Sequence, residues 1–203
     1  MVMTEHGPNA ALLTYFVAYL VIVFGWRSMT VWRATGINPY VLPRDDSAPG
    51  HIGRAMRSVL LALLLVTLGL TLQPSLAAAL GPVQFLQQAW TGALGWVLLL
   101  GSLVWITAAQ ISMGPSWRVG IDPGTPAALV QRGLFRVSRN PIFLGMRLTL
   151  LGLLLVEPNA VTVAALVAGE LLMQVQVRLE EAHLETVHGE TYRLYRQQVR
   201  RWL

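Results

Sequence analysis

Two charged residues interrupt apolar segments in the C-terminal half of the chain, and they are the first candidates for chemistry. Arg147 lies in the segment 141–156, about 10 Å beyond Asn140 at 1.5 Å per helical residue, and Glu170 lies in the segment that begins at residue 160. In hydrocarbon such charges are costly, and they normally face a partner or a water-filled cavity. We therefore expect an Arg147–Glu170 pair between adjacent antiparallel helices. Two structural interpretations are open: the pair is a salt bridge that joins the helices, or Arg147 snorkels to the membrane interface. The functional alternative is that the pair lines a polar cavity.

Glu170 is also the first member of a longer row of polar side chains. The members follow each other at spacings of three or four residues, which places them on one face of a helix: Glu170, Gln174, Arg178, Glu181 and Glu185. For Glu185 we favour a solvated helix end. Glu170 and Gln174 would lie in hydrocarbon, so the row predicts one wall of a pocket that opens at the membrane surface.

The last residues of the chain, "EEAHLETVHGETYRLYRQQVRRWL", predict a helix, a break at Gly189 and a short second helix. In this second helix the apolar and aromatic side chains fall near one face: Tyr192, Tyr195, Val199 and Trp202. This tail is expected either to lie on the membrane surface or to fold back as a lid over the pocket.

The elements that must position these side chains are membrane spans. Of the 203 residues, 54% are hydrophobic and 12% are charged, with a mean hydropathy of +0.53, and no charged residue occurs between Arg57 and Arg118. A span needs about 20 apolar residues. The charge-free region therefore holds two spans, separated by a turn region at 73–88. Further spans are predicted at 11–26, at 141–156 and from 160 to about 177.

The predicted fold class is therefore an all-α, polytopic membrane protein with about five transmembrane helices and a C-terminal cytoplasmic helical segment. We expect a single membrane domain over 1–203, in which 1–111 holds three spans. The part 112–203 supplies a loop, two spans and the tail, and we expect it to carry the catalytic residues.

Arginine placement predicts the orientation in the membrane. All 15 basic residues are Arg; apart from Arg147 and Arg178 they lie in 27–57, in 118–139 and in the tail. By the positive-inside rule the N-terminus is outside, and both basic loops and the C-terminus are cytoplasmic, as in a bacterial-type inner or plasma membrane. The net charge of +5 favours anionic lipid headgroups as partners, and no nucleic-acid motif occurs. With no Cys and poorly spaced His residues, we expect no metal site.

Two stretches resemble the integral-membrane methyltransferases, namely the isoprenylcysteine carboxyl methyltransferases and the related phospholipid N-methyltransferases. They are "LVQRGLFRVSRNPIFLG" and "RLEEAHLETVHGETYRLYRQQVRRWL". The positions that match the family signature are Gly133, Phe135, Arg139, Pro141, Gly145, Glu180, Glu181, Gly189, Tyr192 and Tyr195. Two positions depart from it, because Asn140 replaces a His and Phe143 replaces a Tyr. Asn140 keeps its hydrogen bonds but does not titrate near neutral pH.

The resemblance implies that S-adenosylmethionine is held at the cytoplasmic membrane surface by the loop, the start of the fourth span and the tail. A lipophilic acceptor would then enter sideways from the bilayer. The expected cofactor contacts are Gly133, Leu134, Phe135, Arg139, Asn140, Pro141, Phe143, Gly145, Glu180, Tyr192 and Tyr195.

Methyl transfer from a sulfonium is an in-line displacement, so alignment and dehydration matter more than a strong base. A carboxylate acceptor, such as isoprenylcysteine, needs only a cation to place it, and Arg178 or Arg147 would serve. An amine acceptor needs a base, and Glu181 or Glu180 is the nearest candidate. We expect a carboxylate, with Arg178 and Glu181 as catalytic residues. The residues expected to face the acceptor are Arg147, Glu170, Gln174 and Trp117.

Two other functions remain open on the sequence. A membrane sterol-reductase-like enzyme would use NADPH and bind its 2′-phosphate with cations of the Arg132–Arg139 loop. In a membrane protein that is not an enzyme, the polar row would serve helix packing alone.

Overall fold

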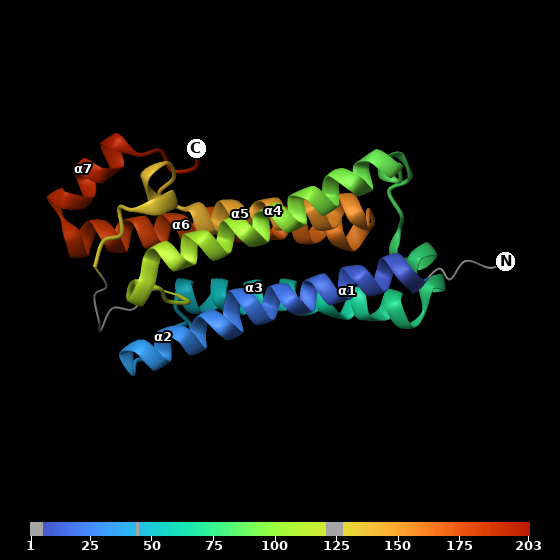
Figure 1. Ribbon diagram of the computed structural model, residues 1–203, viewed down its shortest axis with the longest axis horizontal. Coiled ribbons are helices and arrows are strands. Elements are labelled where there is room, and N and C mark those ends of the chain that lie inside the picture. The colour runs from blue at the N-terminus through green and yellow to red at the C-terminus, as the bar shows by residue number, and fades with distance from the viewer. Residues whose placement is uncertain (1–5, 44, 121–127) are drawn as a thin grey trace.

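The computed structural model describes residues 6–43, 45–120 and 128–203. These residues form a bundle of long helices (Figure 1), and apart from two isolated bridges this described part of the chain contains no strand. The predicted all-α fold is confirmed. The helices are α1 (His6–Leu20), continued by a π-helical stretch, η1 (Val21–Trp26), and α2 (Arg27–Thr35), then α3 (Ala48–Leu72), α4 (Ala89–Met113), α5 (Pro141–Val156), α6 (Ala160–His188) and α7 (Glu190–Gln198).

Four helical segments are long and apolar enough to cross a membrane: Asn9–Thr35, Ala48–Leu72, Ala89–Ser116 and Ala160–His188. The fifth predicted span, α5, has 16 residues. It would extend about 24 Å, which is less than the roughly 30 Å of a hydrocarbon core. The described structure therefore has four full-length candidate spans and one shorter apolar helix, and α5 has the bounds that its flanking Pro141 and "EPN" turn predicted.

Capping residues and glycine set the helix ends near the site. The Asn159 side chain accepts hydrogen bonds from the backbone N–H groups of Val161 and Thr162, both at 3.0 Å, and so begins α6. At the other end of α6, Gly189 has φ +52°, a conformation that other residues rarely adopt, and the chain turns there into α7. The predicted break at Gly189 is confirmed.

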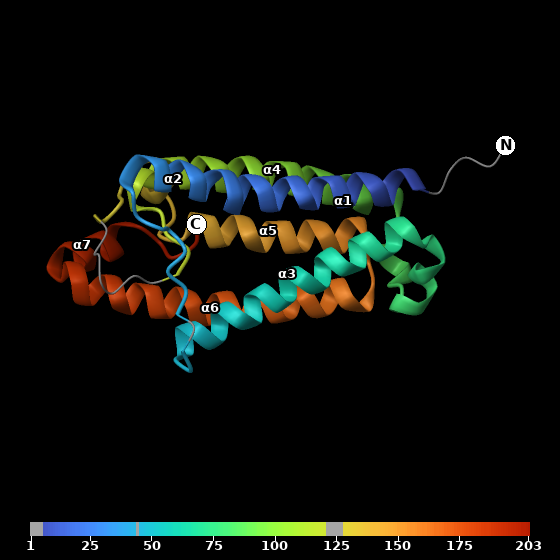
Figure 2. The ribbon, with the colours of Figure 1, turned by 90° about the horizontal axis from the view of Figure 1, so that it is seen from below.

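Helix α5 lies between α4 and α6 (Figure 2) and packs most closely against α4. Glycines make this approach possible, because a Cβ on Gly95 would lie 2.9 Å from the carbonyl oxygen of Gly152. Leu99 and Ile106 of α4 are fully buried in the core, together with Leu153 of α5. Helix α5 is thus fixed along its length by the helix before it in the chain.

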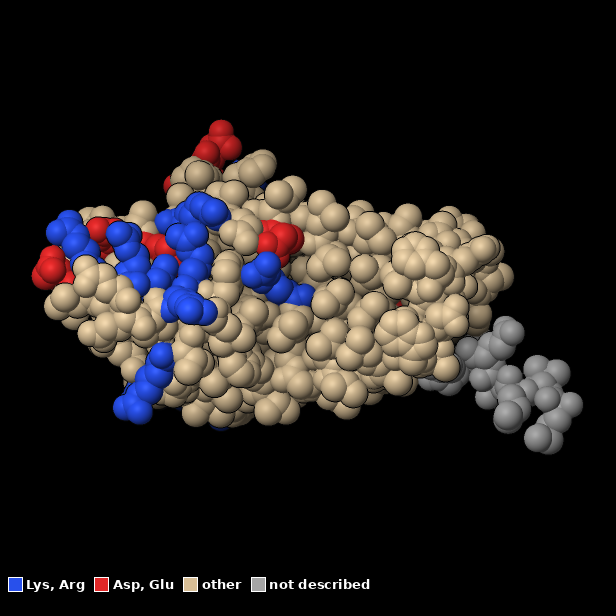
Figure 3. Space-filling model, turned by 90° about the horizontal axis from the view of Figure 1, so that it is seen from above, with Lys and Arg blue, Asp and Glu red and all other residues tan. Residues whose placement is uncertain are grey.

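The two ends of the bundle differ in character. At the end away from α7, the turn after α3 is joined to the α5–α6 turn, because Gly81 accepts a hydrogen bond from the Ala160 N–H at 3.1 Å. At the α7 end, charged side chains gather on the face shown in Figure 3, while the rest of that face is almost free of charge. The polar chemistry is therefore concentrated at the end where α5 begins and α6 ends.

Candidate functional site

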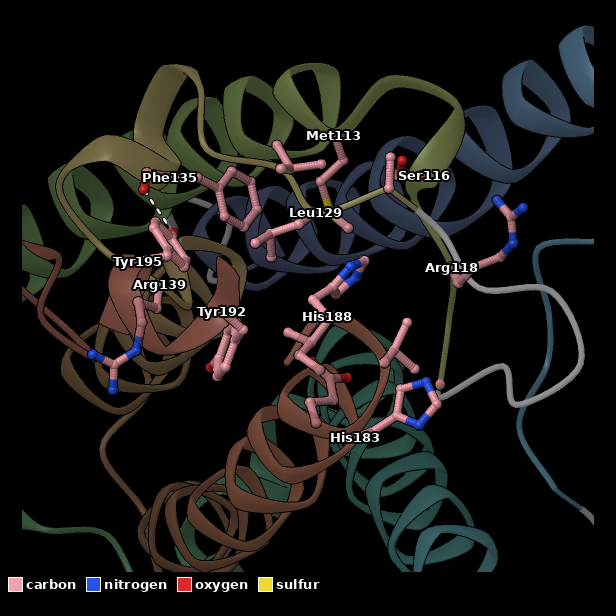
Figure 4. A pocket seen from close by; sticks show the side chains of 16 residues that line it. Met113, Ser116, Arg118, Leu129, Phe135, Arg139, His183, His188, Tyr192 and Tyr195 are labelled. Carbon is pink, nitrogen blue, oxygen red and sulfur yellow. Dashed lines mark hydrogen bonds between the residues drawn. The ribbon is translucent and has the colours of Figure 1, made fainter. Parts of the chain in front are cut away.

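A cavity lies at the α7 end of the bundle, between the end of α6, α7 and the loop that precedes α5 (Figure 4). We call it the α7 cavity. Its polar lining residues are Ser116, Arg118, Arg139, Glu180, His183, His188, Tyr192 and Tyr195, and its apolar walls include Met113, Leu129, Val130, Phe135, Leu184 and Val187. Residues 121–127, in the connection between α4 and α5, lie outside the described residues. The mixture of apolar walls and converging polar groups is typical of a small-molecule site.

Two polar atoms in this lining are buried without a partner. The Nε2 atom of His188 and the hydroxyl of Tyr192 have no hydrogen-bond partner among the described residues. Buried polar atoms in proteins are nearly always paired, so unpaired ones in a cavity wall indicate a ligand that completes them. Burial also raises the pKa of Tyr192 to about 12, so its phenol stays neutral and can donate a hydrogen bond.

The carboxylate of this cavity is Glu180, whose Oε1 accepts a hydrogen bond from Gln176 at 3.1 Å. Tyr195 closes one side of the wall, because its hydroxyl donates to the backbone carbonyl of Phe135 at 2.7 Å and so joins α7 to the loop (Figure 4). A carboxyl group, two unpaired polar atoms and aromatic walls suit a cofactor that carries a cation, several polar groups and a flat base. These residues therefore fit S-adenosylmethionine.

Glu181 points away from the α7 cavity into a cluster that we call the clasp. The clasp consists of Arg139, Asn140, Glu181 and Arg201. The carboxylate of Glu181 accepts hydrogen bonds from Arg139 at 3.1 Å, from the Asn140 amide at 3.1 Å and from Arg201 at 2.8 Å. The side chains of Arg139 and Glu181 are only 9% and 7% exposed. Because a buried charge without a partner is strongly destabilising, each member holds the others in place.

The membrane-side pair that the sequence predicts is present. The Nε of Arg147 lies 2.6 Å from a carboxylate oxygen of Glu170, and the two side chains are 30% and 33% exposed. Glu170 also accepts from the Gln174 amide at 2.8 Å, and Arg178 donates to the Gln174 side chain at 2.8 Å. The first three members of the polar row and Arg147 thus form one hydrogen-bonded chain along α6.

These hydrogen-bonded side chains do not line the α7 cavity. Arg147, Glu170, Gln174, Arg178 and Glu181 are all absent from its lining, which uses another face of α6. The structure therefore separates the predicted acceptor-facing residues and both predicted catalytic residues from the predicted cofactor site. Arg178 is exposed on the outside of α6, and Glu181 is enclosed in the clasp.

The expected cofactor contacts divide into two groups. The cavity lining includes Phe135, Arg139, Glu180, Tyr192 and Tyr195 and does not include Gly133, Leu134, Asn140, Pro141, Phe143 and Gly145. Several of the second group hold the loop and α5 against α4. A Cβ on Gly133 would collide with Ser112 and one on Gly145 with Ile106, and the Pro141 carbonyl accepts from the Trp105 indole at 2.9 Å.

Trp117 is not part of the cavity lining either, although its neighbours Ser116 and Arg118 are. It is 3% exposed, and the guanidinium of Arg27 lies 5.9 Å from its ring centroid. Arg27 donates to the carbonyl of Gly114, and Arg132 donates to the carbonyl of Ser112 at 2.9 Å. The two arginines thus cap the C-terminal end of α4, where carbonyl groups lack helical partners.

His183 and His188 were not predicted as lining residues, because their spacing was weighed only for a metal site. Helical spacing from Glu180 would have found them. Positions three, four, seven and eight residues after Glu180 share its helix face, and they are His183, Leu184, Val187 and His188. The polar row that begins at Glu170 passes through Glu181 instead, and Glu181 points to the clasp.

A sequence model of the phospholipid methyltransferase family matches residues 90–191. The matched region is half of the chain and runs from α4 into α7, so it contains Phe135, Arg139, Glu180 and His188 of the cavity lining. A search of curated proteins gave no match. The family match also agrees with the resemblance carried by the loop and tail motifs. The chain therefore belongs to the phospholipid methyltransferase family of membrane methyltransferases.

Proposed function

We propose that the protein transfers a methyl group from S-adenosylmethionine to a lipophilic acceptor that enters from the bilayer. The observation that carries this proposal is the α7 cavity, in which His188 and Tyr192 present unpaired buried atoms beside the Glu180 carboxylate. When bound, the cofactor supplies an electrophilic methyl group on a sulfonium. Glu180 would face the cationic part of the cofactor, and His188 and Tyr192 would hydrogen-bond its polar groups.

The cavity walls serve the same reaction. Apolar side chains such as Phe135, Leu129 and Leu184 exclude water, and the Tyr195–Phe135 hydrogen bond fixes α7 against the loop. Both features favour an in-line displacement, which depends on alignment and dehydration. An NADPH reductase is less well supported. Two of the three arginines in the loop that would bind a 2′-phosphate are engaged elsewhere, Arg132 with the end of α4 and Arg139 in the clasp, which leaves Arg136 as the exposed cation of that loop.

For the acceptor we propose an ionised carboxylate on an isoprenoid or similar lipid chain, as in isoprenylcysteine. A carboxylate needs no base, and Glu181, one of the two candidate bases, is already paired with two arginines. Arg147 of α5 and Arg178 of α6 provide cations outside the cavity to attract such an acceptor. The second candidate is a phospholipid amine. The description of the matched family favours it, and Glu180 would then be the base.

The experiment is a methyl-transfer assay with radiolabelled S-adenosylmethionine on purified protein in lipid nanodiscs. N-acetyl-S-farnesylcysteine and vesicles of phosphatidylethanolamine are offered in separate reactions. A carboxyl methyl ester releases volatile methanol in alkali, whereas an N-methyl group does not. We expect alkali-labile product from the farnesylcysteine only. Alkali-stable product from the phosphatidylethanolamine would establish the amine acceptor instead, and label transfer to neither would contradict the proposed acceptor classes.

A further inference from the structure

The last five residues of the chain, 199–203, form a short irregular segment that we call the strap. After α7 ends, the strap runs beside the beginning of α5, and both ribbon views place the C-terminus there (Figures 1 and 2). The backbone N–H of Arg139 donates to the Arg200 carbonyl at 2.9 Å, and its guanidinium donates to the Val199 carbonyl at 2.6 Å. The Asn140 amide and the Ser138 hydroxyl both donate to the Arg201 carbonyl at 3.3 Å.

Two side chains of the strap add contacts to the spans. Arg201 binds Glu181 with two hydrogen-bonding nitrogens, the closest at 2.8 Å. Trp202 stacks on Arg147, whose guanidinium carbon lies 4.4 Å from the ring centroid. The strap therefore connects Arg139, which lines the α7 cavity, with Arg147, which lies in the membrane-side chain of polar residues. Arg139 lies just before α5, and Arg147 lies about 9 Å along the helix from its first residue, Pro141.

The manner of attachment lets the strap detach without unfolding a helix. Residues 200–203 make no helical hydrogen bonds, and the contacts described above attach them to α5 and α6 through side chains and carbonyl groups. Trp202 and Leu203 lie beyond the clasp residue Arg201, and a terminal segment of this kind opens at much lower free energy than the core of a domain. When Trp202 leaves, Arg147 exposes two guanidinium nitrogens, Nη1 and Nη2, that have no hydrogen-bond partner among the described residues.

We propose that the strap closes the route between the bilayer and the α7 cavity, and that an acceptor with an anionic group enters by displacing Trp202 from Arg147. The inference rests on the proposed function, because it assigns the strap to the entry of the proposed acceptor. The anionic group takes the place of the Trp202 ring at the guanidinium of Arg147. The acceptor then continues along α5 past Arg201 and Asn140 toward the cavity wall.

A closed strap lowers the apparent affinity for the acceptor, because only the open fraction of molecules binds it. Trp202→Ala should therefore lower the KM for N-acetyl-S-farnesylcysteine by about three- to tenfold, the range expected when one cation–π contact is lost. Trp202→Phe retains an aromatic face and should stay near the native KM. The affinity for S-adenosylhomocysteine should be unchanged in both variants, because Trp202 does not line the cavity.

Trp90→Ala is the matched control, because Trp90 is 66% exposed at the opposite end of the bundle from the strap. Trp90→Ala should change neither the KM for N-acetyl-S-farnesylcysteine nor the affinity for S-adenosylhomocysteine. An unchanged or raised KM in Trp202→Ala would overturn the proposal. So would a parallel loss of S-adenosylhomocysteine affinity, which would make Trp202 a support of the cavity instead.

A second measurement tests the strap without relying on any reaction. The chain has no cysteine, so Leu203→Cys, at a 62% exposed position, accepts a single nitroxide label. In nanodiscs of phosphatidylcholine, electron paramagnetic resonance should show an immobile label in the native background. Trp202→Ala should make the label mobile and Trp202→Phe should not. A label that is mobile in the native background, or immobile in Trp202→Ala, would overturn the proposal even if the methyl-transfer assay succeeds.

Discussion

Glu180 and Glu181 are neighbours on α6, yet they face different surroundings. Glu180 lines the α7 cavity, and Glu181 is enclosed by Arg139, Asn140 and Arg201. The family resemblance marked both positions but did not separate their roles. One residue along a helix turns a side chain by about 100°, and only the packing of the tail decides which of the two faces the cavity. Asn140 is a similar case. It was expected to contact the cofactor, but its amide donates a hydrogen bond to Glu181 in the clasp.

The clasp gives a direct prediction for stability. Glu181→Gln removes the negative charge that three donors share, and it leaves Arg139 and Arg201 buried or half-buried without a counter-ion. We expect the free energy of unfolding in detergent to fall by about 3–5 kcal/mol, as when one partner of a buried ion pair is removed. Chemical denaturation, monitored by circular dichroism, measures this free energy of unfolding. Glu185→Gln, in an exposed ion pair, should cost far less, because solvent screens such pairs. Equal losses in the two variants would show that the clasp is not stabilising.

The guanidinium of Arg147 lies in an apolar helix because it is paired with Glu170. A double-mutant cycle measures the interaction free energy of this pair. Arg147→Met and Glu170→Gln should each destabilise by roughly 1–3 kcal/mol, because each leaves a polar partner unsatisfied. The double variant should recover much of that loss. If the pair also guides the acceptor, the double variant regains stability but not turnover. Losses that simply add would mean that the two residues are not energetic partners.

At the scale of elements, the sequence predicts helix ends well where a local signal exists. Pro141, the "EPN" turn and Gly189 are such signals, and α5, α6 and α7 begin or end there. Close packing has no comparable signal. Gly133 and Gly145 were assigned to the cofactor because the family motif contains them, yet in the structure they let the loop and α5 approach α4. The partner helix lies far away in the sequence, so no local pattern shows it.

The α4–α5 contact predicts a sharp difference between two glycines. A Cβ on Gly152 would lie 2.9 Å from the Leu99 side chain and 3.0 Å from the Gly95 carbonyl, whereas one on Gly101 would meet nothing within 4 Å. Gly152→Ala should therefore destabilise by about 1–3 kcal/mol through overpacking. Gly101→Ala should be neutral or slightly stabilising, because alanine is the better helix former. The melting temperatures of both variants, measured in the same detergent, test this difference. Equal melting temperatures would contradict the close α4–α5 packing.

At the scale of the whole molecule, hydropathy and the charge-free region predicted the helical membrane fold, and the family match agrees with it. The α7 cavity was harder to predict, because its lining comes from α4, the connection between α4 and α5, α6 and α7. Such convergence depends on tertiary packing. The tail posed the same difficulty, since its sequence suited both a surface helix and a lid, and the structure places its end against α5 and α6.

The orientation in the membrane stays a prediction that rests on the arginine distribution. Charged side chains gather at the α7 end of the bundle (Figure 3), and we expect this end to be cytoplasmic, where it would contact anionic lipid headgroups. Reporter fusions at Gln87 and at Leu203 should therefore report opposite sides, with Leu203 inside. The same side for both positions would contradict the five-helix topology.

The most direct test of the account is a calorimetric titration of the purified protein in detergent with S-adenosylhomocysteine and, separately, with NADPH. We expect S-adenosylhomocysteine to bind with a micromolar Kd and NADPH not to bind. Glu180→Gln and His188→Phe should each weaken binding severalfold, and Glu185→Gln, outside the cavity, should bind like the native protein. Heat from NADPH alone, or native affinity for S-adenosylhomocysteine in both Glu180→Gln and His188→Phe, would contradict the assignment of the α7 cavity as the methyl-donor site.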